Sequence, residues 1–276
     1  MSRFWADALQ RKLGRPVVVV NRTGGSGSVG HTAGARAKAD GNTVTMITFE
    51  LSTMHRMGIS DLTHEDFTPL MQVNADPAAI IVRADSKWKS LSDFLAQAKE
   101  HPGELKMSGT ASGGAWDLAR AGLLQAAGLK VESVIWMPNK GAAPSLVELI
   151  GGHVDAVCCS IPEAAQSIES GELRVLAVLN DERMPDYPEV ETAKEAGVDW
   201  VVMGWRGLAL PKDTPDDVVA SLEQTCQEIG ESAEYAEFMK KNGFGIRLSG
   251  PAEFREFLKA QDATWKSVVE AAGYAK

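Results

Sequence analysis

Residues 105–128, with the sequence LKMSGTASGGAWDLARAGLLQAAG, contain one complete strand–turn–helix unit. Leu105–Ser108 predicts a short strand, and the spacing of apolar residues over 115–127 predicts a helix. Gly128 follows the helical run, where a left-handed C-cap favours glycine. A strand that leads through a glycine-rich turn into a helix is typical of α/β proteins, because the helix returns the chain to begin a parallel strand.

The same alternation continues on both sides of this unit. The other predicted strands cover residues 17–20, 43–48, 78–82, 131–137, 156–159 and 173–178. The other predicted helices cover residues 28–39, 92–100, 142–150 and 162–170. From Pro215 onward the pattern changes to helices, over 218–230, 233–242 and 251–272. We therefore predict an α/β fold with mostly parallel sheets and helices on both faces.

Two extended segments, 71–82 and 201–210, are placed where the chain can cross between lobes. Two crossings predict a discontinuous first lobe, 1–76 plus 206–276, and an inserted central lobe, 77–205. We expect a ligand site in the cleft between such lobes, because concave sites occur preferentially at domain interfaces.

Composition excludes several classes of function. The 276 residues carry a net charge of -9, which argues against nucleic acid, whose binding depends on Lys and Arg that neutralise phosphates. A local field can still favour a small anion. The three cysteines have no zinc-site spacing, and we expect them to be buried apolar side chains, so no metal is predicted. No apolar run approaches the ~20 residues that a membrane-spanning helix needs.

The stretch VVVVNRTGGSGSVG, residues 17–30, contains the pattern G-x-G-x-x-G at Gly25, Gly27 and Gly30, and Glu50 follows about 20 residues later. This spacing is typical of a dinucleotide-binding unit, but there the first glycine follows the strand almost at once. Four residues separate Val20 from Gly25 here. We interpret the glycines as a wide turn that opens a helix, and we keep an NAD-dependent oxidoreductase as an alternative. The five histidines are expected at the surface and offer no catalytic base.

Three other turns run from a predicted strand end to a predicted helix start, at residues 108–114, 138–141 and 158–163. Their hydroxyls and unobstructed backbone N–H groups suit a carboxylate or phosphate at a helix N-terminus. The alternative is that they only cap their helices. Parallel strands bring their C-terminal ends to one edge of a sheet, and this convergence favours a ligand.

Six segments match a known family in order and spacing. They are PVVVVNRTGGSGSVG (16–30), KADGNTVTMIT (38–48), GELKMSGTASGG (103–114), PNKGAAPSLVELIGGHVDAV (138–157), IESGELRVLAVLNDERMPDYPEVETAKEAG (168–197) and GWRGLALPKDTP (204–215). Together they resemble the Bug (TctC-like) extracytoplasmic solute receptors of tripartite tricarboxylate transporters, from about Phe4 to Tyr274. The resemblance implies a two-lobed type II periplasmic-binding-protein-like fold, with Rossmann-like lobes around a ligand cleft.

The resemblance also implies a function. Such a receptor captures a small carboxylic acid in the periplasm, delivers it to membrane transporter subunits, and has neither catalytic residues nor a cofactor. A monomer is expected, and an orphan sensor-type binding protein is a further alternative. The implied ligand-binding residues are Thr48, Glu50, Ser108, Gly109, Thr110, Ala111, Ser112, Gly113, Gly114, Trp116, Lys140, Gly141, Ser160, Trp205 and Arg206.

Two features depart from the pattern of the family. The family places a strand and a Pro/Gly-rich turn before the helix that begins here near Phe4, so we expect the first strand, one anion site and the secretion signal to be absent. Two acids, Glu50 and Asp117, would repel a polyanion unless Lys140 and Arg206 offset them. One hypothesis is a ligand that also carries an amine or a polar body with an apolar ring, and the alternative is that both acids point to solvent.

Overall fold

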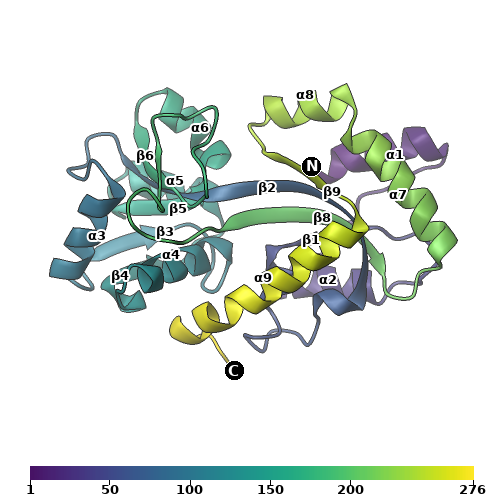
Figure 1. The fold of residues 1–276 in the computed structure, drawn as a ribbon, viewed down its shortest axis with the longest axis horizontal. Helices are drawn as coiled ribbons and strands as arrows, with labels where there is room; N and C mark the ends of the chain where they lie inside the picture. The colour runs from purple at the N-terminus through teal and green to yellow at the C-terminus, as the bar shows by residue number, and fades with distance from the viewer. The chain divides into compact units, whose positions relative to one another are not determined.

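The computed structural model describes residues 1–276, and the chain divides into two compact units (Figure 1). Unit 1 comprises Met1–Ala75, Trp205–Lys266 and Lys276, and unit 2 comprises Asp76–Gly204 and Ser267–Ala275. The chain passes from one unit to the other within strands β2 (Phe67–Arg83) and β8 (Met203–Pro211), and again within helix α9 (Pro251–Ala271). The passage within α9 is not apparent from the sequence pattern.

Unit 2 is built on a mixed sheet. Strand β3 (Leu105–Ser108) pairs in parallel with β4 (Val134–Met137) and with β5 (Ala156–Ser160). The second half of β2 pairs antiparallel with β5 and with β6 (Leu173–Val178), and β6 pairs in parallel with β7 (Glu191–Thr192). The helices of this unit are α3 (Leu91–Glu100), α4 (Ala115–Ala126), α5 (Ala142–Ile150) and α6 (Ile161–Glu169).

Unit 1 has a smaller antiparallel sheet. Strand β1 (Thr45–Thr48) pairs with β8, which neighbours β2, and β9 (Ile246–Ser249) also pairs with β2. Its helices are α1 (Ser2–Leu13), α2 (Ser28–Ala35), α7 (Asp216–Gly230), α8 (Ala233–Lys241) and the first part of α9. Short 3-10 turns cover Gly25–Gly27, Phe49–Ser52 and His64–Asp66 here, and Val131–Ser133 in unit 2.

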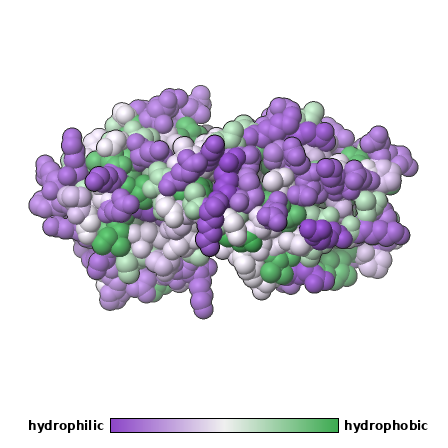
Figure 2. Space-filling model, turned by 90° about the horizontal axis from the view of Figure 1, so that it is seen from below, coloured by the Kyte–Doolittle hydropathy of each residue, from purple (hydrophilic) through white to green (hydrophobic).

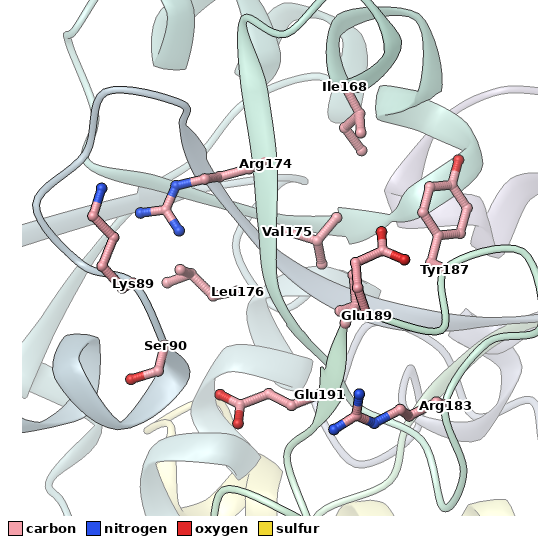
Figure 3. Close-up of a pocket in the computed structure, with 11 residues that line it drawn as sticks. Lys89, Ser90, Ile168, Arg174, Val175, Leu176, Arg183, Tyr187, Glu189 and Glu191 are labelled. Carbon is pink, nitrogen blue, oxygen red and sulfur yellow. The ribbon is translucent and has the colours of Figure 1, made fainter.

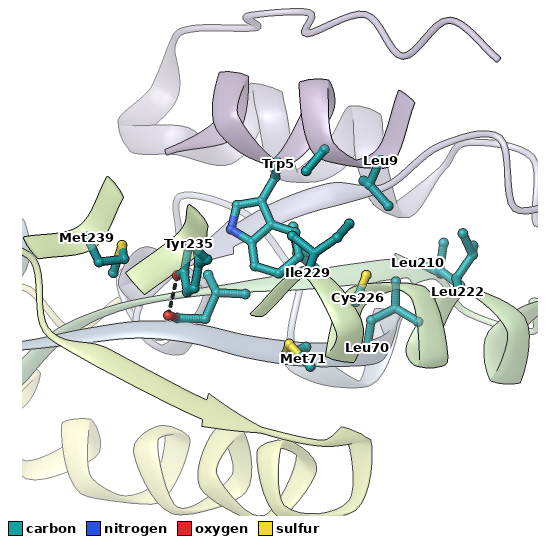
Figure 4. Packing of buried hydrophobic residues seen from close by; sticks show 13 residues of the cluster. Trp5, Leu9, Leu70, Met71, Leu210, Leu222, Cys226, Ile229, Tyr235 and Met239 are labelled. Atoms are coloured by element: carbon teal, nitrogen blue, oxygen red, sulfur yellow. Dashed lines mark hydrogen bonds between the residues drawn. The ribbon is translucent and has the colours of Figure 1, made fainter. Parts of the chain in front are cut away.

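The core of unit 1 joins the two ends of the chain (Figure 4). Trp5 and Leu9 of α1 pack against residues of β2, α7 and α8, and the rings of Trp5 and Tyr235 meet edge to face at 5.3 Å. The buried Tyr235 hydroxyl donates to the Val73 carbonyl at 2.6 Å, which satisfies the polar end of a large apolar residue (Figure 4).

Most predicted elements are present, but the prediction of mostly parallel sheets is wrong, because β1 pairs antiparallel with β8, and β2 pairs antiparallel with β5, β6 and β9. Three predictions of single elements are also wrong. Residues 17–20 form no strand, because a β-branched run needs a partner edge, and Val18 and Val20 are 78% and 68% exposed. The helix predicted over 28–39 ends at Ala35. In place of one strand over 131–137, a 3-10 turn precedes β4. Strand β9 was not predicted, because its four residues alternate apolar and polar side chains over too short a stretch to stand out.

The surface and the cysteines agree with the composition. The three cysteines are free and buried, as expected. None of the helices combines the length and apolar character that crossing a membrane requires. On the face shown in Figure 2, hydrophilic residues are interspersed with small hydrophobic groups, which is ordinary for a folded protein surface.

Candidate functional site

The structure brings the three predicted turns of unit 2 together at the carboxyl ends of β3, β4 and β5. The Asn139 N–H donates to the Thr110 carbonyl at 3.0 Å, which joins the first two turns. A Cβ atom added to Gly109 would lie 2.4 Å from the carbonyl oxygen of Cys158, at the third turn. Glycine at this position therefore allows the close approach of two backbones.

Ser145, in the first turn of α5, was missed by the sequence analysis although it connects the same turns. Its fully buried hydroxyl lies 3.2 Å from the Gly109 carbonyl oxygen and 2.9 Å from that of Gly141. Ser108, which is also buried, donates to the Met137 carbonyl at 2.7 Å and lies 3.0 Å from the Ser145 hydroxyl. The Ser108 and Ser145 hydroxyls therefore hold the turns to one another.

Two helices begin in these turns without a side-chain cap. Gly114 is the N-cap of α4 and Gly141 is the N-cap of α5, and neither end receives a side-chain hydrogen bond. The first N–H groups of a helix have no partner inside the helix, so an uncapped end is suited to an anion. By contrast, α3 begins with a capping box of Ser90 and Asp93, and α6 with one of Ser160 and Glu163.

Thr110 provides a further unsatisfied group in the first turn. Its Oγ1 atom is buried and has no hydrogen-bond partner. A Cβ on Gly114 would lie 2.6 Å from that oxygen, so only glycine at position 114 leaves room for the Thr110 hydroxyl beside the N-terminus of α4. A buried hydroxyl without a partner is destabilising, which makes Thr110 a candidate donor to a ligand oxygen.

The other predicted residues of these turns differ in their roles. The Ser160 hydroxyl and N–H both donate to Glu163 Oε2 at 3.0 Å, as a helix cap does. Ala111 and Ser112 are exposed in the first turn, and Lys140 is exposed beside Gly141. Of these residues, only Lys140 brings a positive charge to the turns.

Two tryptophans pack against the first turn. Trp116, on α4, is buried, and a Cβ on Gly204 would lie 2.8 Å from its Cη2 atom. A Cβ on Gly109 would lie 2.8 Å from Trp136 Cη2 and 3.0 Å from Trp116 Cβ. Gly109 therefore lies between the two side chains, which gives the turn a rigid aromatic support.

Asp117 does not point to solvent, so this alternative for the two acids is wrong. It is fully buried, and its Oδ1 atom accepts from Arg120 Nε at 3.2 Å and Nη2 at 2.7 Å. Its Oδ2 atom accepts from the Gly113 N–H at 2.9 Å and from the Tyr274 hydroxyl at 2.6 Å. Burial and the hydrogen bond to Asp117 raise the pKa of Tyr274 to about 12. The charge of Asp117 is therefore balanced inside the protein.

The predicted residues of unit 1 form a second group. Thr48 lies opposite Arg206 in the pairing of β1 with β8, and the Thr48 hydroxyl donates to Glu50 Oε2. Arg206 Nη1 donates to Asn74 Oδ1. Trp205 is 1% exposed and packs within the core of this unit.

His31 is buried beside this group, so the expectation that every histidine lies at the surface is wrong. Its Nδ1 atom lies 2.8 Å from the Gly27 carbonyl oxygen, and its Nε2 atom accepts from the Thr48 N–H at 3.2 Å. These contacts place the ring proton on Nδ1. The glycine-rich stretch therefore orients a histidine that holds the backbone of Thr48.

Unit 2 also has a groove of about 370 Å³ away from the predicted turns (Figure 3). Several of its charged groups have partners within the protein. Glu191 accepts from the Leu91 N–H at 3.1 Å, Lys89 Nζ donates to the Ser86 carbonyl at 3.2 Å, and Arg183 pairs with an acid outside the groove. Arg174 Nη2 also donates to the Ser86 carbonyl at 3.2 Å, whereas its buried Nε atom has no hydrogen-bond partner.

Comparison with known proteins places the chain in one family. The family described as the tripartite tricarboxylate transporter family receptor, TctC, matches residues 1–274. BugT of Bordetella pertussis is 32% identical over 99% of this chain and 84% of its own length. A TctC solute-binding protein from Polaromonas is 32% identical, with a TM-score of 0.83 over 97% of this chain and 91% of its own. Rpa4515 of R. palustris, solved with adipate, is 28% identical, with a TM-score of 0.85 over 99% of this chain and 92% of its own.

These matches decide between the functional alternatives. The relatives are solute-binding receptors, so an NAD-dependent oxidoreductase is the wrong interpretation of the glycine stretch. The α/β fold is that of periplasmic binding proteins, as predicted. The chain belongs to the TctC family of tripartite tricarboxylate transporter receptors, which includes the Bug proteins.

Proposed function

We propose that this protein captures a small carboxylic acid in the periplasm and delivers it, as a monomer, to a tripartite tricarboxylate transporter. The observation that carries the proposal is the meeting of two uncapped helix N-termini, at Gly114 and Gly141, in turns joined by hydrogen bonds. The relative Rpa4515, solved with adipate, supports a carboxylate as the ligand.

The proposed contacts follow from the groups that lack partners. A ligand carboxylate would accept hydrogen bonds from the first N–H groups of α4 and from the Thr110 hydroxyl. Each hydrogen bond to a charged group contributes roughly 1.5–3 kcal/mol, so three of them contribute about 4.5–9 kcal/mol, which corresponds to millimolar to micromolar binding. Lys140 would add attraction for the anion from the α5 side.

The buried Asp117 does not oppose this proposal, because Arg120 neutralises it at 2.7 Å. An amine on the ligand is therefore not needed to offset Asp117. Glu50, which is half-buried in unit 1, keeps that hypothesis open. That Thr48, Glu50, Trp205 and Arg206 also contact the ligand stays a prediction.

Titration calorimetry with adipate, malate, citrate and aspartate tests the proposal. We expect one or more of these acids to bind, and Thr110→Val to weaken the binding about tenfold, which is the loss of one charge-assisted hydrogen bond. Thr264→Val is the matched control, because the Thr264 hydroxyl is exposed and bonds only within α9. If no organic acid binds, or if both variants bind like the wild type, the assignment of the turns is wrong.

Delivery to a transporter needs a separate measurement. A bacterial strain that takes up the bound acid through a tripartite transporter should lose uptake when its gene for this protein is deleted. The wild-type gene should restore uptake, and the Thr110→Val gene should restore it only at higher concentrations of the acid. Normal uptake in the deletion strain would refute the transport role.

A further inference from the structure

Tyr274, near the end of the chain, lies in unit 2 against the turn that precedes α4. Its hydroxyl donates to Asp117 Oδ2 at 2.6 Å, and the same oxygen accepts the Gly113 N–H at 2.9 Å. Burial and Asp117 raise the pKa of the Tyr274 hydroxyl to about 12. Tyr274 thus contacts the carboxylate that holds the turn.

The two oxygens of Asp117 have separate roles in this contact. Oδ1 is occupied by Arg120, whose Nη1 atom also donates to the carbonyls of Val131 at 2.7 Å and Val134 at 2.8 Å. Oδ2 is left to the Gly113 N–H and the Tyr274 hydroxyl. Arg120 therefore holds Asp117 against the backbone at Val131 and Val134. Asp117 in turn holds the turn through its hydrogen bond from the Gly113 N–H.

The conformation of the turn depends on such anchors. Gly113 is buried and has a φ of +72°, which is a left-handed conformation. Glycine adopts this conformation without steric cost, but it adopts other conformations equally easily. The hydrogen bond to Asp117 selects this conformation, and Gly114 and the uncapped start of α4 follow directly. The direction of the first α4 N–H groups is thus set by the contact at Oδ2.

We propose that Tyr274 is a positioning residue of the ligand site: it holds Asp117, which in turn holds the Gly113 N–H, so that the turn is preset for a carboxylate. The inference rests on the proposed function of this turn. A preset turn loses less conformational freedom when ligand binds, and preorganisation of this kind raises affinity without adding a contact. The chain places the anchor 157 residues away from Asp117, on the segment that continues α9.

Affinity is the first measurement. Tyr274→Phe removes only the hydroxyl, and we expect about tenfold weaker binding of adipate, or of whichever acid the wild type binds best, by titration calorimetry. Tyr187→Phe is the matched control, because Tyr187 lies in the loop before β7 and lines the groove of Figure 3. We expect that variant to bind like the wild type.

A double variant distinguishes positioning from a general loss of stability. If Tyr274 acts through Asp117, then Tyr274→Phe combined with Asp117→Asn should bind no more weakly than the weaker single variant. Effects that multiply would assign the two residues independent roles and overturn the inference. The variants are compared at a temperature where circular dichroism shows each of them fully folded.

Hydrogen exchange supplies a readout in the protein without ligand. The Gly113 amide should exchange about tenfold faster in Tyr274→Phe than in the wild type, with exchange in β3 unchanged. Equal exchange at Gly113, or faster exchange with unchanged affinity, overturns the positioning role and leaves the proposed function intact. If the wild type binds no acid, the proposed function fails, and the positioning role fails with it.

Discussion

Replacing Arg120 by methionine tests how the buried ion pair stabilises unit 2. The Arg120 and Asp117 side chains are 4% and 0% exposed and meet at 2.7 Å. Methionine fills most of the same space but leaves the Asp117 carboxylate buried without a counter-charge. It also leaves the carbonyls of Val131 and Val134 without the Arg120 donor.

The magnitude follows from this geometry. Removing one partner of a buried ion pair costs roughly 3–5 kcal/mol of unfolding free energy, because the remaining charge stays desolvated. The matched control is Arg183→Met, because Arg183 and Glu195 of the same unit pair at 2.9 Å with both side chains nearly half exposed. An exposed pair of this kind contributes only about 0–1 kcal/mol. The two variants remove the same type of side chain and differ in burial.

Differential scanning calorimetry and urea unfolding measure the difference. We expect Arg120→Met to lower the transition that contains unit 2 by on the order of 10 °C, and Arg183→Met to lower it by a few degrees at most. The double variant Asp117→Asn with Arg120→Met should lose less unfolding free energy than the sum of the losses in the two single variants, because the neutral amide needs no counter-charge. Equal losses for the buried and the exposed pair would refute the reasoning.

Three further predictions concern packing and chemistry elsewhere. Gly34→Ala should cost about 1–3 kcal/mol in urea unfolding, because the new Cβ would lie 2.1 Å from Thr45 Oγ1, and Thr45→Ala should recover part of the loss if the clash is the cause. Trp5→Ala should cost about 3–5 kcal/mol by the same measurement, and a loss below 1 kcal/mol would contradict the packing of α1 in the unit 1 core. Burial raises the pKa of all three cysteines, that of Cys226 to about 12, so iodoacetamide at pH 8 should label none of them in the native protein and all of them after unfolding. Labelling of the native protein would show that a cysteine is accessible.

The parts of the fold that could be predicted from the sequence are those that local interactions determine. Strand β3, the following turn and α4 are short-range features, and they lie where the pattern of residues 105–128 places them. Residues 17–20 have the composition of a strand, but strand formation depends on a partner elsewhere in the chain. Strand β9 also depends on a distant partner, because its four residues pair with β2.

In the candidate site, too, the features set by local sequence were predicted and those set by distant contacts were not. The turns and their glycines were predicted, whereas Tyr274 was not, because its contact with Asp117 spans 157 residues and leaves no local pattern. The burial of Asp117 has the same origin. An acid in the first turn of a helix is ordinarily exposed to solvent, where its charge interacts favourably with the helix dipole. The only local sign of an Asp117–Arg120 ion pair is that Arg120 follows Asp117 by three residues.

The glycine stretch shows why a motif of glycines is weak evidence for a ligand. A Cβ on Gly30 would lie 2.9 Å from the Arg22 carbonyl oxygen, so that glycine serves the packing of one backbone on another. Gly27 has a φ of +90°, and its carbonyl oxygen contacts the His31 ring at 2.8 Å. Two of the three glycines of the apparent cofactor pattern are therefore explained by close packing or by a left-handed backbone, without a bound phosphate. Because close approach and left-handed backbone select glycine in a folded chain with or without a ligand, the pattern indicates a cofactor only when a strand leads directly into it, and here residues 17–20 form none.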